Sequence, residues 1–233
     1  MSVALKDLPD FTESGMVGHR LINAKFPPID LFNDVATLDD FEALYAIQSL
    51  TNPRLQNELG NLSLLDLNEI PFGISGCHYA AAPFTHINPD GSRFSDGSYG
   101  VLYIADTLET AIEEVKYHQQ TYWQGVLGLE YERFVFKQLA CTFDVTLGVD
   151  ATSVSMSDPI YSPMQYTASR VLGQNVKASG FSTLKYQSVR HSQGACYALF
   201  TPKEITAITQ ARHIEMVWKE GSIKWNYLMG GCT

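Results

Sequence analysis

The stretch GSRFSDGSYGVLYIADTLETAIEEV, residues 91–115, decides the fold. Its first part belongs to the segment richest in turn-forming residues, so we predict a loop or tight hairpin over 83–100. The run VLYIA predicts a short strand over 101–105, and Asp106 provides a cap for a helix over 107–119. A strand followed at once by an amphipathic helix indicates a fold that mixes both kinds of element.

Outside this stretch, the sequence predicts a helix in the N-terminal part of the chain and a mixture of helices and strands after it. Residues 1–36 look irregular, because the pair Pro27 and Pro28 argues against a continuous helix. Thr37 begins a short helix whose apolar spacing ends before Pro53. Downstream, the patterns predict a strand over 133–147, a loop over 150–163 and a second strand over 195–200.

Length and composition fit one globular protein with a substantial core. The chain has 233 residues, of which 45% are hydrophobic and 18% charged. We therefore predict an α+β fold with a central β core flanked by helices. Within it, we expect an N-terminal helical extension over 1–75, packed on the core of a domain over 76–233.

Net charge and cysteine spacing exclude several classes of function. The formal net charge of −9 argues against direct nucleic-acid binding, because phosphate contacts need clustered Lys and Arg. The four cysteines stand far apart without a CxxC pair, and the histidines lack zinc-binding spacing, so we predict no metal site. No signal peptide and no apolar run of membrane-spanning length are found, which predicts a location in the reducing cytoplasm.

Three places hold residues that could carry chemistry, and the first is Arg93 in the Gly/Ser loop. The neighbouring glycines and serines would let backbone amides approach an anion, with Arg93 as a charge-assisted donor. The alternative is a surface loop with a solvated arginine.

The second place is the helix predicted over 107–119, which has an apolar face at helical spacing. At about 100° per residue, Glu114 falls on the flank of that face and Glu113 nearly opposite it. His118 follows Glu114 by one turn on the same side. We expect Glu114 to be the partly buried carboxylate, the alternative being an amphipathic helix with ordinary surface acids.

The third place is TLKYQSVRHSQGACYALF at 183–200, where Ser188, Arg190 and His191 precede an apolar strand. A Ser–His nucleophile is disfavoured, because Ser188 has no GxSxG context and neighbours in sequence do not make a triad. A polar turn that leads into a core strand is the simplest interpretation.

These three places together resemble the RES domain family. Residues 91–115 are similar to the first half of that domain, and YQSVRHSQGACYALFTP at 186–202 is similar to its second half. HRLINAKFPPIDLF at 19–32 and LTNPRL at 50–55 resemble the N-terminal part of longer members, so the resemblance covers roughly 17–225. The Arg, Glu and Ser that give the family its name, together with its active-site tyrosine, match these residues here: Arg93, Glu114, Ser188 and Tyr103.

The resemblance implies a fold like that of ADP-ribosyltransferases and a toxin that degrades NAD⁺ by hydrolysis or phosphorolysis. It implies a partner as well, a helix-turn-helix antitoxin of the Xre type. NAD⁺ is then the substrate, with inorganic phosphate as a co-substrate if the reaction is phosphorolysis, and no further cofactor is expected. With this assignment we predict four catalytic residues, Arg93, Tyr103, Glu114 and Ser188, and four substrate-binding residues, Phe94, Ser95, Arg190 and His118.

The predicted chemistry follows from the bond that breaks. Cleavage between nicotinamide and ribose builds positive charge at the ribose, which a carboxylate such as Glu114 can stabilise. Two alternatives stay open: a protein mono-ADP-ribosyltransferase with the same pocket, and a non-catalytic nucleotide-binding module. The acceptor of the ADP-ribose group also stays open and can be water, phosphate or protein. The oligomeric state stays open as well, and a homo-oligomer is one alternative.

Overall fold

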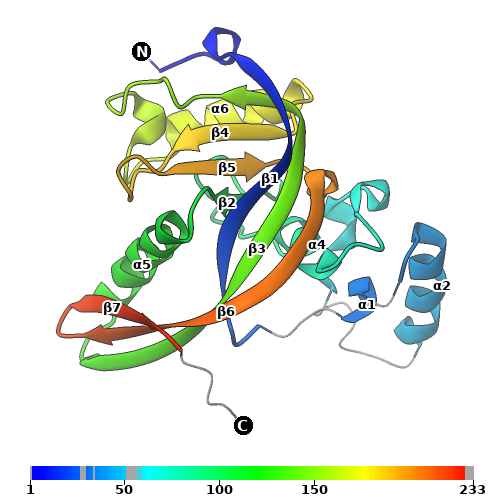
Figure 1. The fold of residues 1–233 in the computed structure, drawn as a ribbon, viewed down its shortest axis with the longest axis horizontal. Helices are drawn as coiled ribbons and strands as arrows, with labels where there is room; N and C mark the ends of the chain where they lie inside the picture. Colours follow the sequence, from blue (N-terminus) through cyan, green and yellow to red (C-terminus); the bar gives the residue numbers. More distant parts are fainter. Residues whose placement is uncertain (1, 27–29, 34, 51–56, 58, 229–233) are drawn as a thin grey trace.

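The structure, a computed structural model of the chain, describes residues 2–26, 30–33, 35–50, 57 and 59–228. Its centre is a seven-stranded mixed sheet with helices on both sides, which confirms the predicted α+β class (Figure 1). The strands are β1 (Asp10–Asn23), β2 (Leu102–Ala105), β3 (Tyr131–Asp150), β4 (Thr183–Gln187), β5 (Ala195–Leu199), β6 (Ile205–Lys219) and β7 (Ser222–Tyr227). The α-helices are α1 (Asp30–Asn33), α2 (Leu38–Ser49), α4 (Cys77–Thr85), α5 (Leu108–Gln124) and α6 (Thr167–Ala178).

Five of the strands close into a ring. The strand order is β1-β2-β5-β4-β3-β6-β7, and β1 also pairs with β3. This closure depends on the length of β3, which pairs with β1 along one edge and with β6 and then β4 along the other. The pairing of β3 with β4 is parallel and all other pairings are antiparallel.

Two hydrophobic clusters flank these strands. One contains Ile112 of α5 and Leu172 of α6, together with buried residues of β4 and β5. The other contains Phe41 of α2 and Phe84 of α4, packed on β2 and β3. Figure 1 shows α5 and α2 on opposite sides of the strands.

Several predicted elements are confirmed. The helix predicted over 107–119 is α5, although its cap is Thr107, whose hydroxyl accepts from the Thr110 amide, rather than Asp106. Thr37 caps α2 in the predicted way. The strands predicted over 101–105, 133–147 and 195–200 correspond to β2, β3 and β5. Pro27, Pro28 and most of the 50–55 motif lie outside the described residues.

The prediction that residues 1–36 are irregular is wrong. Residues Asp10–Asn23 form β1, whose backbone pairs with that of β3 from Asp10 to Asn23. Residues 1–75, for which the sequence predicts a helical extension, therefore also supply a strand of the central sheet. The division of the chain at residue 75 stays a prediction.

Other elements were not anticipated, namely α6, β4, β6 and β7. The loop predicted over 83–100 starts later, because α4 continues to Thr85 with Pro83 inside it. The loop predicted over 150–163 holds the short 3₁₀ helix η4 (Pro159–Tyr161). Within the described ranges, none of the helices has the length and apolar character that a membrane crossing requires.

Candidate active site

A short hydrogen bond joins the second and third of the predicted places. The hydroxyl of Ser188 donates to Oε1 of Glu114 over 2.6 Å, although 74 residues separate the two in sequence. Ser188 is buried and Glu114 is half-buried on α5. A hydroxyl at this distance from an ionised carboxylate makes a charge-assisted hydrogen bond, which fixes the orientation of the carboxylate.

Of the two adjacent glutamates, only Glu114 takes part in this contact. Both carboxylate oxygens of Glu113 accept instead from Nζ of Lys116, at 3.1 Å each. That pair is one helical turn apart and partly exposed, so it contributes little to stability. The helix phase therefore separates a surface ion pair from a carboxylate held inside the site.

Ser188 is held from behind by its own turn. Its hydroxyl oxygen accepts from the backbone amides of Arg190 and His191, at 3.1 and 3.0 Å. The turn can approach α5 because it closes on Gly194, where an added Cβ would stand 2.5 Å from the hydroxyl oxygen of Thr110. Sequence alone marks Gly194 only as a turn residue.

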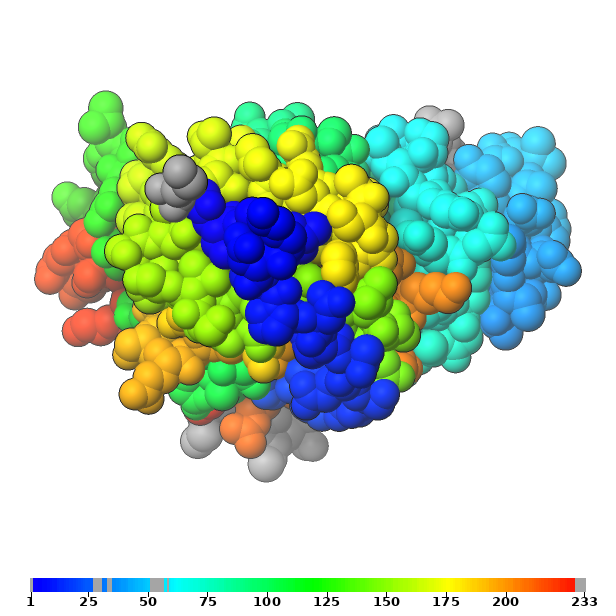
Figure 2. All heavy atoms as spheres, turned by 90° about the horizontal axis from the view of Figure 1, so that it is seen from above, coloured from blue at the N-terminus to red at the C-terminus, as the bar shows by residue number. Residues whose placement is uncertain are grey.

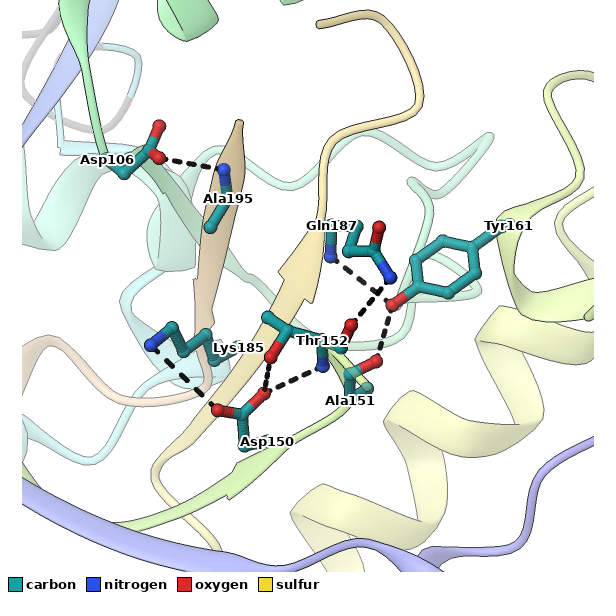
Figure 3. A network of polar contacts seen from close by, with 8 residues as sticks. All are labelled: Asp106, Asp150, Ala151, Thr152, Tyr161, Lys185, Gln187 and Ala195. Carbon is teal, nitrogen blue, oxygen red and sulfur yellow. Dashed lines mark hydrogen bonds and ion pairs between the residues drawn. The ribbon is translucent and has the colours of Figure 1, made fainter. Parts of the chain in front are cut away.

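The end of β4, directly before Ser188, is fixed by a polar network (Figure 3). The side-chain amide of Gln187 donates to the carbonyls of Thr152 and Val154, at 2.6 and 3.0 Å. The hydroxyl of Tyr161 donates to the carbonyl of Ala151 and accepts from the backbone N–H of Gln187. Figure 3 also shows Asp106 accepting from the Ala195 amide at the start of β5, at 2.9 Å. These bonds give the serine a defined position.

Tyr103, on β2, joins the site to the Gly/Ser loop. Its hydroxyl lies 2.7 Å from Oγ of Ser92 and accepts from the Phe94 amide over 3.0 Å. Burial raises the pKa of Tyr103 to about 12, against the opposing effects of these hydrogen bonds and of Arg93. The phenol therefore stays neutral and serves as a hydrogen-bonding group.

Arg93 is buried, and backbone carbonyls orient its guanidinium. Nη1 donates to the carbonyls of Ile160 and Ser162, both at 3.1 Å, and the group lies 4.6 Å from the ring centre of Tyr166. The interpretation of a solvated surface arginine is therefore wrong, because Arg93 is only 9% exposed.

The loop that carries Arg93 is held by a second arginine that the sequence analysis missed. Arg170 of α6 donates to the carbonyls of Ser92 and Asp90, at 3.1 and 2.7 Å. Nothing in the local sequence around Arg170 signals this role, because its partners lie about 80 residues away and are backbone atoms.

Phe94 and Ser95 lie inside the protein. Phe94 is fully buried and packs edge-on against Tyr186 at 4.7 Å. The hydroxyl of Ser95 donates to the Tyr99 carbonyl over 2.6 Å. In this structure both side chains support the loop, and the backbone amide and carbonyl of Phe94 are bonded to Tyr103 and Tyr99.

Arg190 and His118 lie nearer the surface. Arg190 donates to the Pro163 carbonyl over 2.6 Å, and its guanidinium stacks 3.3 Å from the ring centre of Tyr117. His118 is exposed overall, yet partial loss of solvent around its imidazole lowers its pKa. Glu114 opposes this shift, whereas the charges of Arg190 and Arg93 add to it. His118 is thus within electrostatic reach of three predicted site residues.

Tyr186 of β4 links the loop of Arg93 to the turn of Ser188, because its ring packs 4.7 Å from that of Phe94 and it lies two residues before Ser188. Its pKa is raised well above the usual value, first by burial, then by neighbours that include Glu114 and Tyr103, while Arg93 lowers it. Tyr186 therefore lies between these two parts of the candidate site. Together the two parts hold a guanidinium, a neutral phenol, a carboxylate and a serine hydroxyl.

Among the described residues, no group of three or more His, Cys, Asp or Glu side chains is placed so that it could hold a metal ion. A Ser–His nucleophile is also unsupported. His191 contributes its backbone amide to Ser188, while its Nδ1 lies 2.9 Å from the Thr110 hydroxyl.

Comparison with known proteins agrees with the motifs. The sequence model of the RES domain matches residues 70–219. The uncharacterized protein y4oC of Sinorhizobium fredii is 40% identical over 94 residues, a segment that spans 40% of this chain and 40% of that protein. Among solved structures, a chain of the MbcT–MbcA toxin–antitoxin complex of M. tuberculosis is similar with a TM-score of 0.44 and 10% identity, covering 88% of this chain and 86% of that one.

Proposed function

The chain belongs to the RES domain family, and we propose that it is a toxin that depletes NAD⁺ by cleaving the nicotinamide–ribose bond. The observation that carries the proposal is the bond of 2.6 Å between Ser188 and Glu114. The hydroxyl of Tyr103 is hydrogen-bonded to Ser92 and Phe94, on either side of Arg93. The four predicted catalytic residues lie on four different parts of the fold, the Gly/Ser loop, β2, α5 and the turn after β4, and NAD⁺ cleavage has a use for each of them.

Glu114 acts on the reacting ribose. As nicotinamide leaves, positive charge develops at the anomeric carbon, and an ionised carboxylate nearby lowers the energy of that state. The carboxylate also accepts a hydrogen bond from a ribose hydroxyl or from the attacking acceptor. Ser188 holds Oε1 in place, so that the carboxylate does not have to reorganise during the reaction.

Arg93 and Tyr103 hold the two other parts of the substrate. The guanidinium of Arg93 presents donors that match the oxygens of the pyrophosphate, or of inorganic phosphate if phosphate is the acceptor. Tyr103 is neutral and half-buried, so its ring can offer a face to nicotinamide. Nicotinamide is cationic in the substrate and leaves as a neutral molecule, so its departure needs no proton.

An enzyme that consumes NAD⁺ in the cytoplasm of its own host has to be restrained. As part of the same proposal, a helix-turn-helix antitoxin of the Xre type binds the chain and covers the entrance to the site. The net charge of −9 suits a partner that is more basic, because complementary charge speeds association.

The test compares three bacterial strains by growth and by intracellular NAD⁺. Expression of the wild-type chain should arrest growth while NAD⁺ falls, Glu114→Gln should be tolerated, and co-expressed antitoxin should restore growth. Arrest with NAD⁺ unchanged would move the assignment to protein ADP-ribosylation. Normal growth with abundant folded wild-type protein would refute the toxin function.

A further inference from the structure

Two arginines of the site are held by a single loop. Arg93 donates to the carbonyls of Ile160 and Ser162, and Arg190 donates to the carbonyl of Pro163. Neither arginine pairs with a carboxylate within the described ranges. Neutral carbonyls fix the orientation of a guanidinium without cancelling its charge, so both groups stay free to attract an anion.

This loop is itself fixed by Asp158. Oδ1 of Asp158 accepts from the Ile160 amide over 3.0 Å, which caps η4. The same oxygen accepts from the hydroxyl of Ser2 at 3.1 Å, and Oδ2 accepts from the Val3 amide at 2.9 Å. Asp158 therefore ties the first residues of the chain to the loop that carries the arginine-binding carbonyls.

The N-terminal segment covers this part of the molecule. Figure 2 shows the blue N-terminal residues packed against the yellow-green and yellow segments, which include η4 and α6. A cavity of about 500 Å³ remains between them, lined by residues 2–4 on one side and by Pro159, Ser162 and residues of α6 on the other. The loop is held both by its bonds to Asp158 and by packing, because Ile160 and Tyr161 are buried in the core.

We propose that Asp158 is a positioning residue, which acts through η4 to set the guanidiniums of Arg93 and Arg190 for the diphosphate of the substrate. This inference rests on the proposed function. It predicts that the residue controls binding of the phosphate-bearing part of the substrate and has little effect on the reacting bond.

Asp158→Asn is the informative variant. It keeps the size of the side chain but has a single acceptor oxygen, so the bonds from Ile160 and Val3 cannot both survive. Asp66→Ala is the matched control, because Asp66 caps another 3₁₀ helix, η3 (Leu67–Glu69), by accepting from the Asn68 amide at 2.9 Å. Thermal melting of each variant reports whether the fold is intact.

The measurements are kcat and KM for NAD⁺ and the Kd for ADP-ribose and for nicotinamide. In Asp158→Asn, KM and the Kd for ADP-ribose should rise about tenfold, the loss of about 1.4 kcal/mol of binding free energy. The Kd for nicotinamide, which has no phosphate, and kcat should stay within about twofold. In an Arg93→Ala background the same substitution should add less, because one of the two arginines through which it acts is absent.

Three results would overturn the inference. Asp158→Asn could match Asp66→Ala in every constant, it could weaken nicotinamide and ADP-ribose binding equally, or its effect could persist in full in the Arg93→Ala background. Failure of the proposed function looks different, because the wild-type chain would then neither cleave NAD⁺ nor bind ADP-ribose.

Discussion

The bond between Ser188 and Glu114 leads to a quantitative prediction for Ser188→Ala. A hydrogen bond to a charged group is worth about 1.5–3 kcal/mol. If all of that free energy is expressed in the transition state, kcat/KM for NAD⁺ falls about 10- to 150-fold. The substitution also removes the acceptor for the amides of Arg190 and His191. Stability should therefore fall as well, by about 1–3 kcal/mol.

The assay is steady-state NAD⁺ consumption, together with denaturant unfolding of the same samples. Ser192→Ala is the control, because Ser192 is exposed on the same turn, and it should leave kcat/KM within about twofold and the unfolding free energy within about 0.5 kcal/mol. A folded Ser188→Ala enzyme with wild-type kcat/KM would refute the idea that this serine orients the carboxylate.

Three further predictions concern other parts of the site. Arg93→Ala should lower kcat/KM by about 10- to 150-fold, because charge-assisted hydrogen bonds to the substrate are lost. Arg93→Lys should recover only part of the lost activity. Wild-type kinetics in either variant would contradict the role of Arg93. Folding lowers the pKa of His118, so the folded state binds a proton less readily, and stability should fall as the pH drops below about 6.5. His118→Gln should make the unfolding free energy less dependent on pH in that range, and an unchanged slope would be inconsistent with the lowered pKa. Gly194→Ala should lower the unfolding free energy by about 1–3 kcal/mol, because the new Cβ meets the Thr110 hydroxyl, and unchanged denaturant curves would contradict this close approach.

The helices α2 and α5 could be predicted because the residues that start a helix are local signals. Thr37 caps α2 as predicted, and α5 starts where predicted, although its cap is Thr107 and not the neighbouring Asp106. β1 was missed for a physical reason: the side chains of its first half are mostly exposed, and Gly15 and Gly18 interrupt it. Its stability comes from backbone pairing with β3, more than 100 residues away in sequence, and a local pattern carries no sign of such pairing.

The sequence proposes which residues form the candidate site but says less about how they are arranged. Helix phase selects Glu114 over Glu113, and the structure joins Glu114 to Ser188. The groups that position the site are mostly backbone carbonyls and amides, such as those of Ile160 and Ser162 around Arg93. Every residue has a carbonyl and an amide, so residue type gives no signal for these roles.

The most direct test of the central claim is incubation of the purified chain with NAD⁺, with and without phosphate, followed by identification of the products. The wild-type chain should release nicotinamide together with ADP-ribose, or with ADP-ribose 1″-phosphate when phosphate is the acceptor. Glu114→Gln should lose most of this activity with its fold intact, and Glu113→Gln should keep it. Absence of nicotinamide release by the folded wild-type chain, or equal loss of activity in the two glutamate variants, would contradict the account.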